Sequence, residues 1–287
     1  DESGFPKKGT KSVGVKRQYC GALGKKENCQ VGVFLTYVSP RGHAFLDRRL
    51  YLPEEWADDP VRRKEAGVPE AVAFQTKPAL GRAMLAHAFD LGVQGGWVTG
   101  DEVYGSDGTL RRQLEERGQA YVLAVRANEA IWAWDEEQPP QQVRVAELGA
   151  TLPSSTWQRL SAGDGAKGPR WYDRTWVELP RHPRPGWRSW LLMRRSIEDP
   201  TELAYYLACA PAATALQELV HVAGARWSVE QCLEEAKGET GLDQYQVRTW
   251  HSWHRHITLV LLAHAFLAWL RSTSRDRGGK GEPGPGR

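Results

Sequence analysis

The chain has 287 residues, 41% of them hydrophobic, and a formal net charge of +3 at pH 7. This is enough to bury a full core in one large domain, or in one domain with a sizeable insertion. The four cysteines form no CxxC pair and no secretory pattern, which favours reduced thiols in the cytoplasm. No signal peptide is recognised, and the apolar run Ile257–Leu270 is too short to span a bilayer, so we expect a buried helix and no membrane partner.

The first part of the chain predicts a mixed α/β sheet flanked by helices. Short runs of apolar and β-branched residues predict strands at 29–38, 43–52, 96–100 and 120–125. Apolar residues at helical spacing predict helices at 77–92 and 110–117. The charged stretch 58–67 between the hairpin and the first of these helices is expected to be exposed.

Composition changes after Arg126. Residues 127–199 are rich in Trp, Pro, Gly and Arg, and short β-like pieces at 156–160, 171–179 and 187–194 predict a β-rich insertion. A further strand at 202–210 and helices at 214–222, 225–237 and 250–270 follow. The predicted organisation is a core at 1–126, the insertion at 127–199, a helical continuation of the core at 200–271 and a disordered tail at 272–287.

The helix at 225–237 carries a charged face. At 3.6 residues per turn, one side holds Arg226, Glu230, Glu234 and Lys237, while the opposite side is apolar. A solvated stripe of ion pairs would give the same pattern. Two further acids favour a functional reading of this helix.

These acids are Asp1 and Asp101. Asp101 follows the apolar run Gly96–Gly100, which predicts a strand delivering a carboxylate at its C-terminal edge, where open α/β sheets place their sites. Asp1 is expected to close a strand and to pass at once into a Gly/Pro/Lys loop, so that the rest of its strand would lie upstream. Together with Glu230, these carboxylates suit a pair of hard divalent cations.

Several motifs together resemble a known family. They are D-E-S-G-F-P-K-K-G-T-K-S-V-G-V-K-R-Q-Y-C-G at 1–21, G-D-E-V-Y-G at 100–105, R-W-S-V-E at 226–230, E-A-K-G-E-T-G-L-D-Q-Y-Q-V-R at 235–248 and R-H-I-T-L at 255–259. On these residues the chain resembles the catalytic domain of a DDE transposase of bacterial insertion sequences. The likeness is closest to the 701 family, within the group sharing a Tyr-Arg-Glu-Lys signature. Arg226, Glu230 and Lys237 fit the signature spacing, whereas its tyrosine position holds Ala223.

The resemblance implies an RNase H-like fold and metal-dependent cleavage and strand transfer of DNA at insertion-sequence ends. Asp1, Asp101 and Glu230 would be the catalytic metal ligands, holding two Mg²⁺ ions for which Mn²⁺ would substitute. Arg226 and Lys237 would contact phosphates. It further implies a homodimer in the DNA complex and a bacterial cytoplasmic protein that associates with the nucleoid when bound to DNA.

Two other groups of residues are candidates for DNA contact. The basic loop at 7–17 includes Lys7, Lys8 and Lys11, which could neutralise backbone phosphates without reading bases. In the insertion, Trp171 and Trp176 lie among cations and could stack on an unpaired base. A solvated loop, and aromatic residues covering a small sheet, are the structural alternatives.

Two alternative functions remain open at this point. The first is a truncated transposase remnant that binds DNA without catalysis, and the second is a glycosidase with paired carboxylates, which would need no metal. Metal dependence and cleavage of DNA distinguish them. His251, His254 and His256 do not predict a zinc site, because no cysteine lies at a suitable spacing.

Overall fold

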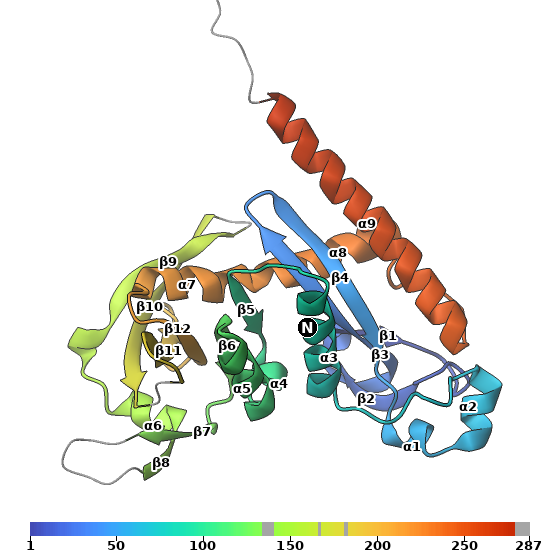
Figure 1. The fold of residues 1–287 in the computed structure, drawn as a ribbon, viewed down its shortest axis with the longest axis horizontal. Coiled ribbons are helices and arrows are strands. Elements are labelled where there is room, and N and C mark those ends of the chain that lie inside the picture. Colours follow the sequence, from blue (N-terminus) through green and yellow to red (C-terminus); the bar gives the residue numbers. More distant parts are fainter. Residues whose placement is uncertain (134–140, 166–167, 181–182, 279–287) are drawn as a thin grey trace, which may run out of the picture. The chain divides into compact units, whose positions relative to one another are not determined.

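The computed structural model describes residues 1–133, 141–165, 168–180 and 183–278 (Figure 1). The chain folds into two compact units. Unit 1 comprises Asp1–Gly92 and Ser228–Arg287, and unit 2 comprises Val93–Trp227. The two units are defined by the contacts within each of them. The domain bounds expected from the sequence, 1–126, 127–199 and 200–271, stay a prediction.

Unit 1 contains an antiparallel sheet built around one long strand. Strand β3 (Lys25–Ser39) pairs with β1 (Glu2–Pro6), β2 (Lys16–Cys20) and β4 (Gly42–Leu50). The hairpin of β3 and β4 confirms the predicted one, with Ser39 opposite Gly42 at its tip. A short 3-10 turn, η1 (Gly21–Leu23), connects β2 to β3.

The loop expected to follow Asp1 is wrong, because the chain continues as β1 from Glu2 to Pro6. Ser3, Gly4 and Phe5 are buried in this strand. Gly4 permits the strand to approach its neighbour, since an added Cβ would lie 2.6 Å from Cys20 Sγ. Pro6 stands at the strand's end, where its missing N–H costs no ladder bond.

Helices cover unit 1. They are α1 (Glu54–Ala57), α2 (Pro60–Ala66), α3 (Lys77–Asp90), α8 (Trp227–Thr240) and α9 (Trp250–Gly278). Helix α3 confirms its prediction, and Thr76 caps its first turn. The stretch 58–67, expected only to be charged and exposed, contains α2, because Asp59 caps its first N–H groups and Gly67 (φ 67°) ends it.

The unit 1 core joins segments from both ends of the chain. Phe5 of β1, Phe34 of β3, Cys232 of α8 and Trp253 of α9 share one buried cluster. A chain of buried hydrogen bonds runs through it. Trp253 Nε1 donates to Tyr245 Oη at 3.1 Å, Tyr245 Oη donates to Gln30 Oε1 at 3.0 Å, and Gln30 Nε2 donates to the Val13 carbonyl at 2.6 Å. These bonds satisfy polar groups that burial alone would destabilise.

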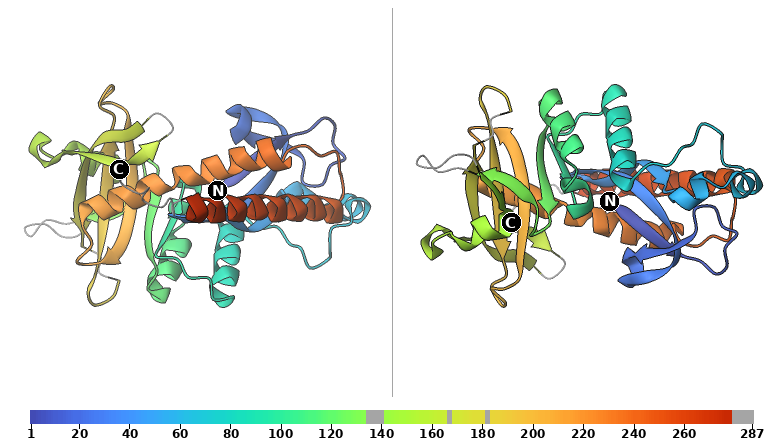
Figure 2. Two further views of the ribbon diagram at one scale, coloured as in Figure 1. Left: turned by 90° about the horizontal axis from the view of Figure 1, so that it is seen from above. Right: turned by 90° about the horizontal axis from the view of Figure 1, so that it is seen from below.

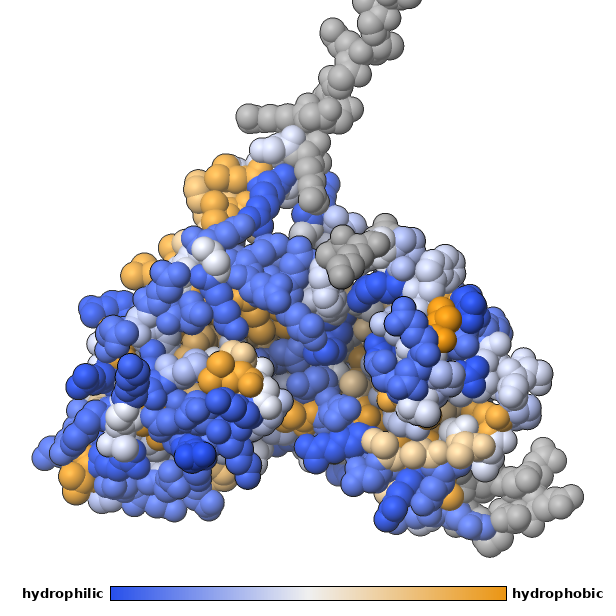
Figure 3. Space-filling model, turned by 180° about the vertical axis from the view of Figure 1, so that it is seen from behind, coloured by the Kyte–Doolittle hydropathy of each residue, from blue (hydrophilic) through white to orange (hydrophobic). Residues whose placement is uncertain are grey.

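Helix α9 has one buried and one exposed apolar face. Trp253, Ile257, Val260 and Leu261 are buried, and the helix packs on β4. Leu259, Leu262, Phe266 and Trp269 are 61%, 65%, 55% and 58% exposed. Figure 3 shows apolar surface towards the upper end of this helix. The predicted buried helix is therefore confirmed for one face only.

Helix α9 is also longer than predicted. Its segment Trp250–Ser274 is long enough to cross a membrane and contains an apolar 18-residue window with a mean hydropathy of 1.4, but this feature alone is weak support for a membrane span. The same segment is bound into unit 1 through Trp253 and Arg271. The helix continues to Gly278, so the tail expected from Ser272 is wrong for 272–278, and residues 279–287 lie outside the described residues.

Unit 2 contains a six-stranded mixed sheet. Its strand order is β5 (Trp97–Gly100), β6 (Ala120–Val125), β12 (Leu203–Pro211), β11 (Trp187–Arg195), β10 (Gly168–Leu179) and β9 (Gln158–Gly165). Only β5 and β6 are parallel. Within the β-rich segment 127–199, β9, β10 and β11 thus belong to the same sheet as β5 and β6, whereas β7 (Ala130–Ala133) and β8 (Gln141–Arg144) pair with each other in a separate sheet.

Both faces of this sheet are covered. Helix α7 (Leu216–Ala225) packs Leu219 and Val220 against one face. On the other, α6 (Val145–Ala150) and the hairpin of β7 (Ala130–Ala133) and β8 (Gln141–Arg144) contribute Val145 and Ile131 to a second core. Helices α4 (Glu102–Gly105) and α5 (Gly108–Arg117) connect β5 to β6, and the 3-10 turn η2 (Ser154–Thr156) precedes β9. The predicted α/β class with an RNase H-like mixed sheet flanked by helices is confirmed.

Candidate active site

Asp1 lies at the start of β1, opposite Phe34 of β3. Its backbone N–H donates to the Phe34 carbonyl at 3.1 Å, and Phe34 N–H donates to the Asp1 carbonyl at 2.8 Å. Side chains alternate along a strand, so Asp1 shares a face with Phe5, which packs in the core that includes α8. The adjacent Glu2 points the other way and forms an ion pair with Lys77 at the start of α3. Asp1 therefore faces the side of the sheet on which α8 packs.

Asp101 follows β5 directly, as predicted, and is the N-cap of α4. Its Oδ1 accepts a hydrogen bond from Val103 N–H at 2.9 Å. Within the part of the chain that the structure describes, no other hydrogen bond reaches this carboxylate. The cap fixes the side-chain rotamer and leaves Oδ2 for a further partner. The parallel pairing of β5 with β6 places this carboxylate at the carboxyl edge of the pair.

Glu230 lies in the first turn of α8 and is exposed. The predicted two-sided helix is confirmed from Trp227 onward, because Cys232, Leu233 and Ala236 are buried while Glu230 and Glu234 are exposed. Its predicted start is wrong, because Ala225 ends α7 and Arg226 lies between the two helices. Packing of the apolar side fixes the helix on the sheet of unit 1. Glu230 therefore projects from a helix held in place by a core, as a metal ligand requires.

Asp1 and Glu230 belong to unit 1, on the same side of its sheet, and Asp101 belongs to unit 2. Convergence of all three carboxylates stays a prediction. The donor set itself is suitable for a hard divalent cation, because all three residues offer carboxylate oxygens. The carboxylate of Asp101 in particular has an oxygen that the helix cap does not use.

The model of the DDE superfamily endonuclease family matches residues 1–178 of the chain. The chain belongs to this family. Membership implies a divalent metal, which the three acids are suited to hold.

The chain is also 27% identical over 264 residues to a protein of Microchaete diplosiphon named "Probable transposase for insertion sequence element IS701". That match covers 86% of this chain and 58% of the relative, so the chain spans little more than half of the relative's length. The resemblance to the DDE transposases of insertion sequences, drawn from the motifs, is confirmed.

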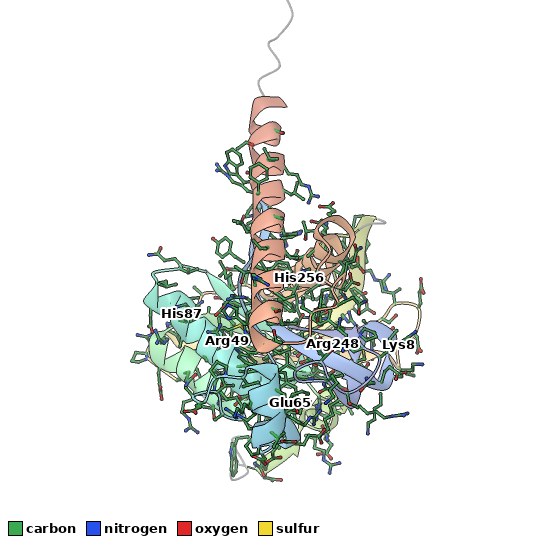
Figure 4. The ribbon with its side chains drawn as sticks, turned by 90° about the vertical axis from the view of Figure 1, so that its right-hand side faces the viewer. Lys8, Arg49, Glu65, His87, Arg248 and His256 are labelled. Carbon is green, nitrogen blue, oxygen red and sulfur yellow. The ribbon has the colours of Figure 1, made fainter. Side chains whose placement is uncertain are left out.

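The three lysines proposed for this DDE endonuclease have different surroundings. Lys7 Nζ donates to the Tyr245 carbonyl at 2.9 Å and lies 3.5 Å from the centre of the Tyr245 ring. Burial lowers the pKa of Lys7, against the raising effect of Asp243. Lys11 forms an exposed ion pair with Glu65 at 3.4 Å. Lys8 is exposed and points outward from unit 1 (Figure 4). Of the three, Lys8 has the surroundings that suit a phosphate contact best.

Arg226 and Lys237 border α8 at its two ends. Arg226 is the C-cap of α7 with helical backbone angles (φ −56°, ψ −31°), and α8 begins at the next residue. Lys237 lies in the last turn of α8 and is half-buried. Ala223, at the signature's tyrosine position, packs partly buried against the unit 2 core. The alanine side chain has no polar group that could contact a phosphate.

The two tryptophans differ. Trp171 of β10 is 52% exposed, so its ring is open to stacking. Trp176 stacks on Trp190 with ring centres 5.4 Å apart and belongs to the α7 side of the unit 2 core. This is the structural alternative considered for these aromatic residues, and it describes Trp176 but not Trp171.

Sequence reasoning missed one cluster. The side chains of His43, Cys232 and His264 come together inside unit 1 from β4, α8 and α9, and no short spacing marks them. Of the histidines considered earlier, His254 Nδ1 lies 2.9 Å from the Trp250 carbonyl and His256 Nε2 lies 3.1 Å from the Gly241 carbonyl. Backbone contacts therefore account for both.

Proposed function

We propose that the chain is the catalytic region of an insertion-sequence transposase that cleaves DNA at the element's ends and transfers the strand in a metal-dependent reaction. The observation that supports this most directly is the position of Asp1 on the sheet face covered by α8, which carries Glu230, in a member of the DDE endonuclease family. Asp101 would join them from the end of β5.

In this proposal Asp1, Asp101 and Glu230 converge and hold two Mg²⁺ ions, with Mn²⁺ as a substitute. Bound metal would activate the attacking hydroxyl and stabilise the leaving oxygen. The chain's own contribution is positioning. The cap bond to Val103 holds the Asp101 carboxylate, and the buried side of α8 holds Glu230. Arg226 and Lys237 would bind phosphates beside Glu230 and favour the charge that develops there.

DNA is the proposed partner, held by Lys8 through backbone phosphates and by Trp171 through stacking. The proposed location is the bacterial cytoplasm, with nucleoid association through DNA. A remnant that binds DNA without catalysis is not favoured, because the family match includes Asp1 and Asp101 and the similarity to a transposase covers 86% of the chain. Paired-carboxylate glycosidase chemistry has no support from these comparisons.

We also infer a homodimer in the DNA complex, formed through α9. The exposed Leu259, Leu262, Phe266 and Trp269 follow one another at spacings of three, four and three residues, which is the seam of a coiled coil. No charged residue stands between Arg255 and Arg271 on this helix, so the seam suits a second copy rather than phosphates.

Sedimentation of the protein with DNA tests the dimer. Leu262→Glu should give one chain per complex, because it places a charge in the seam. Val61→Glu, which alters an exposed apolar residue of α2, should leave the dimer intact. A dimer that survives Leu262→Glu would exclude α9 as the interface.

Cleavage assays on duplexes carrying the element's ends test the catalytic proposal. Asp101→Asn keeps the helix cap but loses the charge, and Glu230→Gln keeps the shape of the side chain, so both should abolish cleavage with little change in melting temperature. Wild type should cut with Mg²⁺ or Mn²⁺ and stop in chelator.

Each variant has a matched control on a neighbouring element. Asp107→Asn changes the cap of α5 in the same way, and Glu234→Gln lies one turn beyond Glu230 on α8. Both controls should cut at nearly the wild-type rate. Cleavage by Asp101→Asn or Glu230→Gln at that rate, or cleavage in chelator by wild type, would exclude the proposed metal site.

A further inference from the structure

Four potential metal ligands lie close together inside unit 1. None of them is one of the three acids of the candidate active site. Cys232 and Glu235 lie on α8, His43 on β4 and His264 on α9. His43 Nε2 lies 3.1 Å from Glu235 Oε2, and His264 Nε2 lies 3.7 Å from the same oxygen. Cys232 Sγ lies 4.0 Å from His264 Nε2. The ligand atoms of His43, Cys232 and His264 all lie within 4.8 Å of one another.

We propose that His43, Cys232, Glu235 and His264 bind a structural Zn²⁺ ion. Two imidazoles, a thiolate and a carboxylate are the ligand types that zinc takes in four-coordinate sites. Tetrahedral bonds of the usual zinc lengths place ligand atoms about 3.3–3.6 Å apart. The observed separations bracket this range, so small side-chain rotations would close the site around an ion.

Without a metal ion, the other contacts of the His264 imidazole and the Cys232 thiol do not explain why these polar groups are buried. His264 is 1% exposed and Cys232 is fully buried. Among the described residues, His264 Nδ1 has no hydrogen-bond partner, and Nε2 makes only the long contact to the Cys232 thiol and the approach to Glu235. An imidazole in such a position costs free energy unless another interaction satisfies it. Coordination to a cation would supply that interaction.

The cluster also has the supporting contacts and the access that a metal site needs. Gln231 Nε2 donates to Glu235 Oε1 at 2.9 Å, and Arg271 Nη1 donates to Glu235 Oε2 at 2.8 Å, so the carboxylate is held in place. The side chains of His43 and Glu235 are 13% and 20% exposed, which gives an ion a route from solvent.

Binding would replace the proton of the Cys232 thiol with the metal ion. The thiolate is the form that binds metal, and the cation replaces the proton. His43 and His264 would bind as neutral imidazoles.

A zinc ion here would join β4, α8 and α9 at one point. Cys232 is two residues from Glu230 on α8, so the ion would fix the helix that carries this acid. Its role would be positioning rather than reaction with DNA. The site takes a soft thiolate ligand, whereas the three acids offer only oxygen and suit Mg²⁺.

Metal analysis of the purified full chain tests the proposal without any activity measurement. Protein from zinc-supplemented culture, desalted in Mg²⁺ buffer, should contain about one zinc per chain. Replacing zinc with Co²⁺ should give an absorption band from the cobalt–thiolate bond. Cys232→Ser should lose the band and most of the zinc.

Control variants distinguish this site from others. Cys209→Ser alters a buried cysteine of β12 and should retain the metal, as should Glu230→Gln, which removes the proposed catalytic ligand. His43→Gln changes the more exposed side of the cluster and is therefore less prone to misfold. It should also lose most of the zinc, and circular dichroism checks that it is folded. Wild type without bound zinc would overturn the proposal, and so would zinc retained by both Cys232→Ser and folded His43→Gln.

Discussion

The two units hold their acids in different ways. In unit 2, Asp101 is fixed by its own neighbourhood, because it follows β5 and its carboxylate accepts from Val103, two residues later. In unit 1, α8 is fixed by distant residues, since its buried side packs with Phe34 and Phe45 of the N-terminal sheet. Figure 2 shows α8 and α9, coloured orange and red, against the blue strands of that sheet. Glu230 therefore depends on tertiary packing, whereas Asp101 depends mainly on local backbone geometry.

The largest expected effect comes from breaking the long-range packing of unit 1. Trp253 is fully buried and donates to Tyr245, so Trp253→Ala should destabilise unit 1 by about 3–5 kcal/mol. Amides of β3, β4 and α8 should lose protection in hydrogen exchange, while those of β11 and β12 in unit 2 keep theirs.

The reverse experiment uses Leu192 of β11, which is also fully buried. Leu192→Ala should cost about 2–5 kcal/mol and expose amides of unit 2 alone. Equal loss of protection in both units with either variant would mean that they unfold as one, and the contrast between local and long-range positioning would fail.

The same contrast explains which features the sequence could predict. The hairpin of β3 and β4, helix α3 and the position of Asp101 after β5 follow from local periodicity, capping and a Gly-Asp step. The two faces of α8 follow from helical geometry in the same way. The motifs supplied the family, which short-range patterns alone could not.

Other features depend on contacts that a local pattern does not contain. Residues 2–6 read as a loop because Gly and Pro are poor strand formers, yet pairing with β3 makes them a strand. The cluster of His43, Cys232, Glu235 and His264 was missed because His43 and Glu235 are 192 residues apart and Cys232 and His264 are 32 apart. The exposed apolar face of α9 was also missed, because a continuous apolar run does not indicate which face of the helix is buried in the core and which is exposed.

A smaller effect distinguishes the two units in DNA binding. Unit 1 should act through charge and unit 2 through stacking. Lys8→Ala should reduce the log–log salt slope of DNA affinity by about one, because one phosphate contact is lost. Trp171→Ala should leave that slope unchanged and weaken binding to single strands by about 1–3 kcal/mol. Fluorescence anisotropy over a range of salt concentrations measures both quantities.

Lys7 is the matched control for Lys8, because the two are adjacent in sequence and differ in surroundings. The Lys7 amine is engaged with the carbonyl and ring of Tyr245, so Lys7→Ala should lower the stability of unit 1 by about 1–2 kcal/mol while changing the salt slope little. An equal reduction of slope by both substitutions would show that net charge in this loop, rather than the outward position of Lys8, governs phosphate binding. Identical slopes for wild type and Lys8→Ala would remove the loop from the DNA interface.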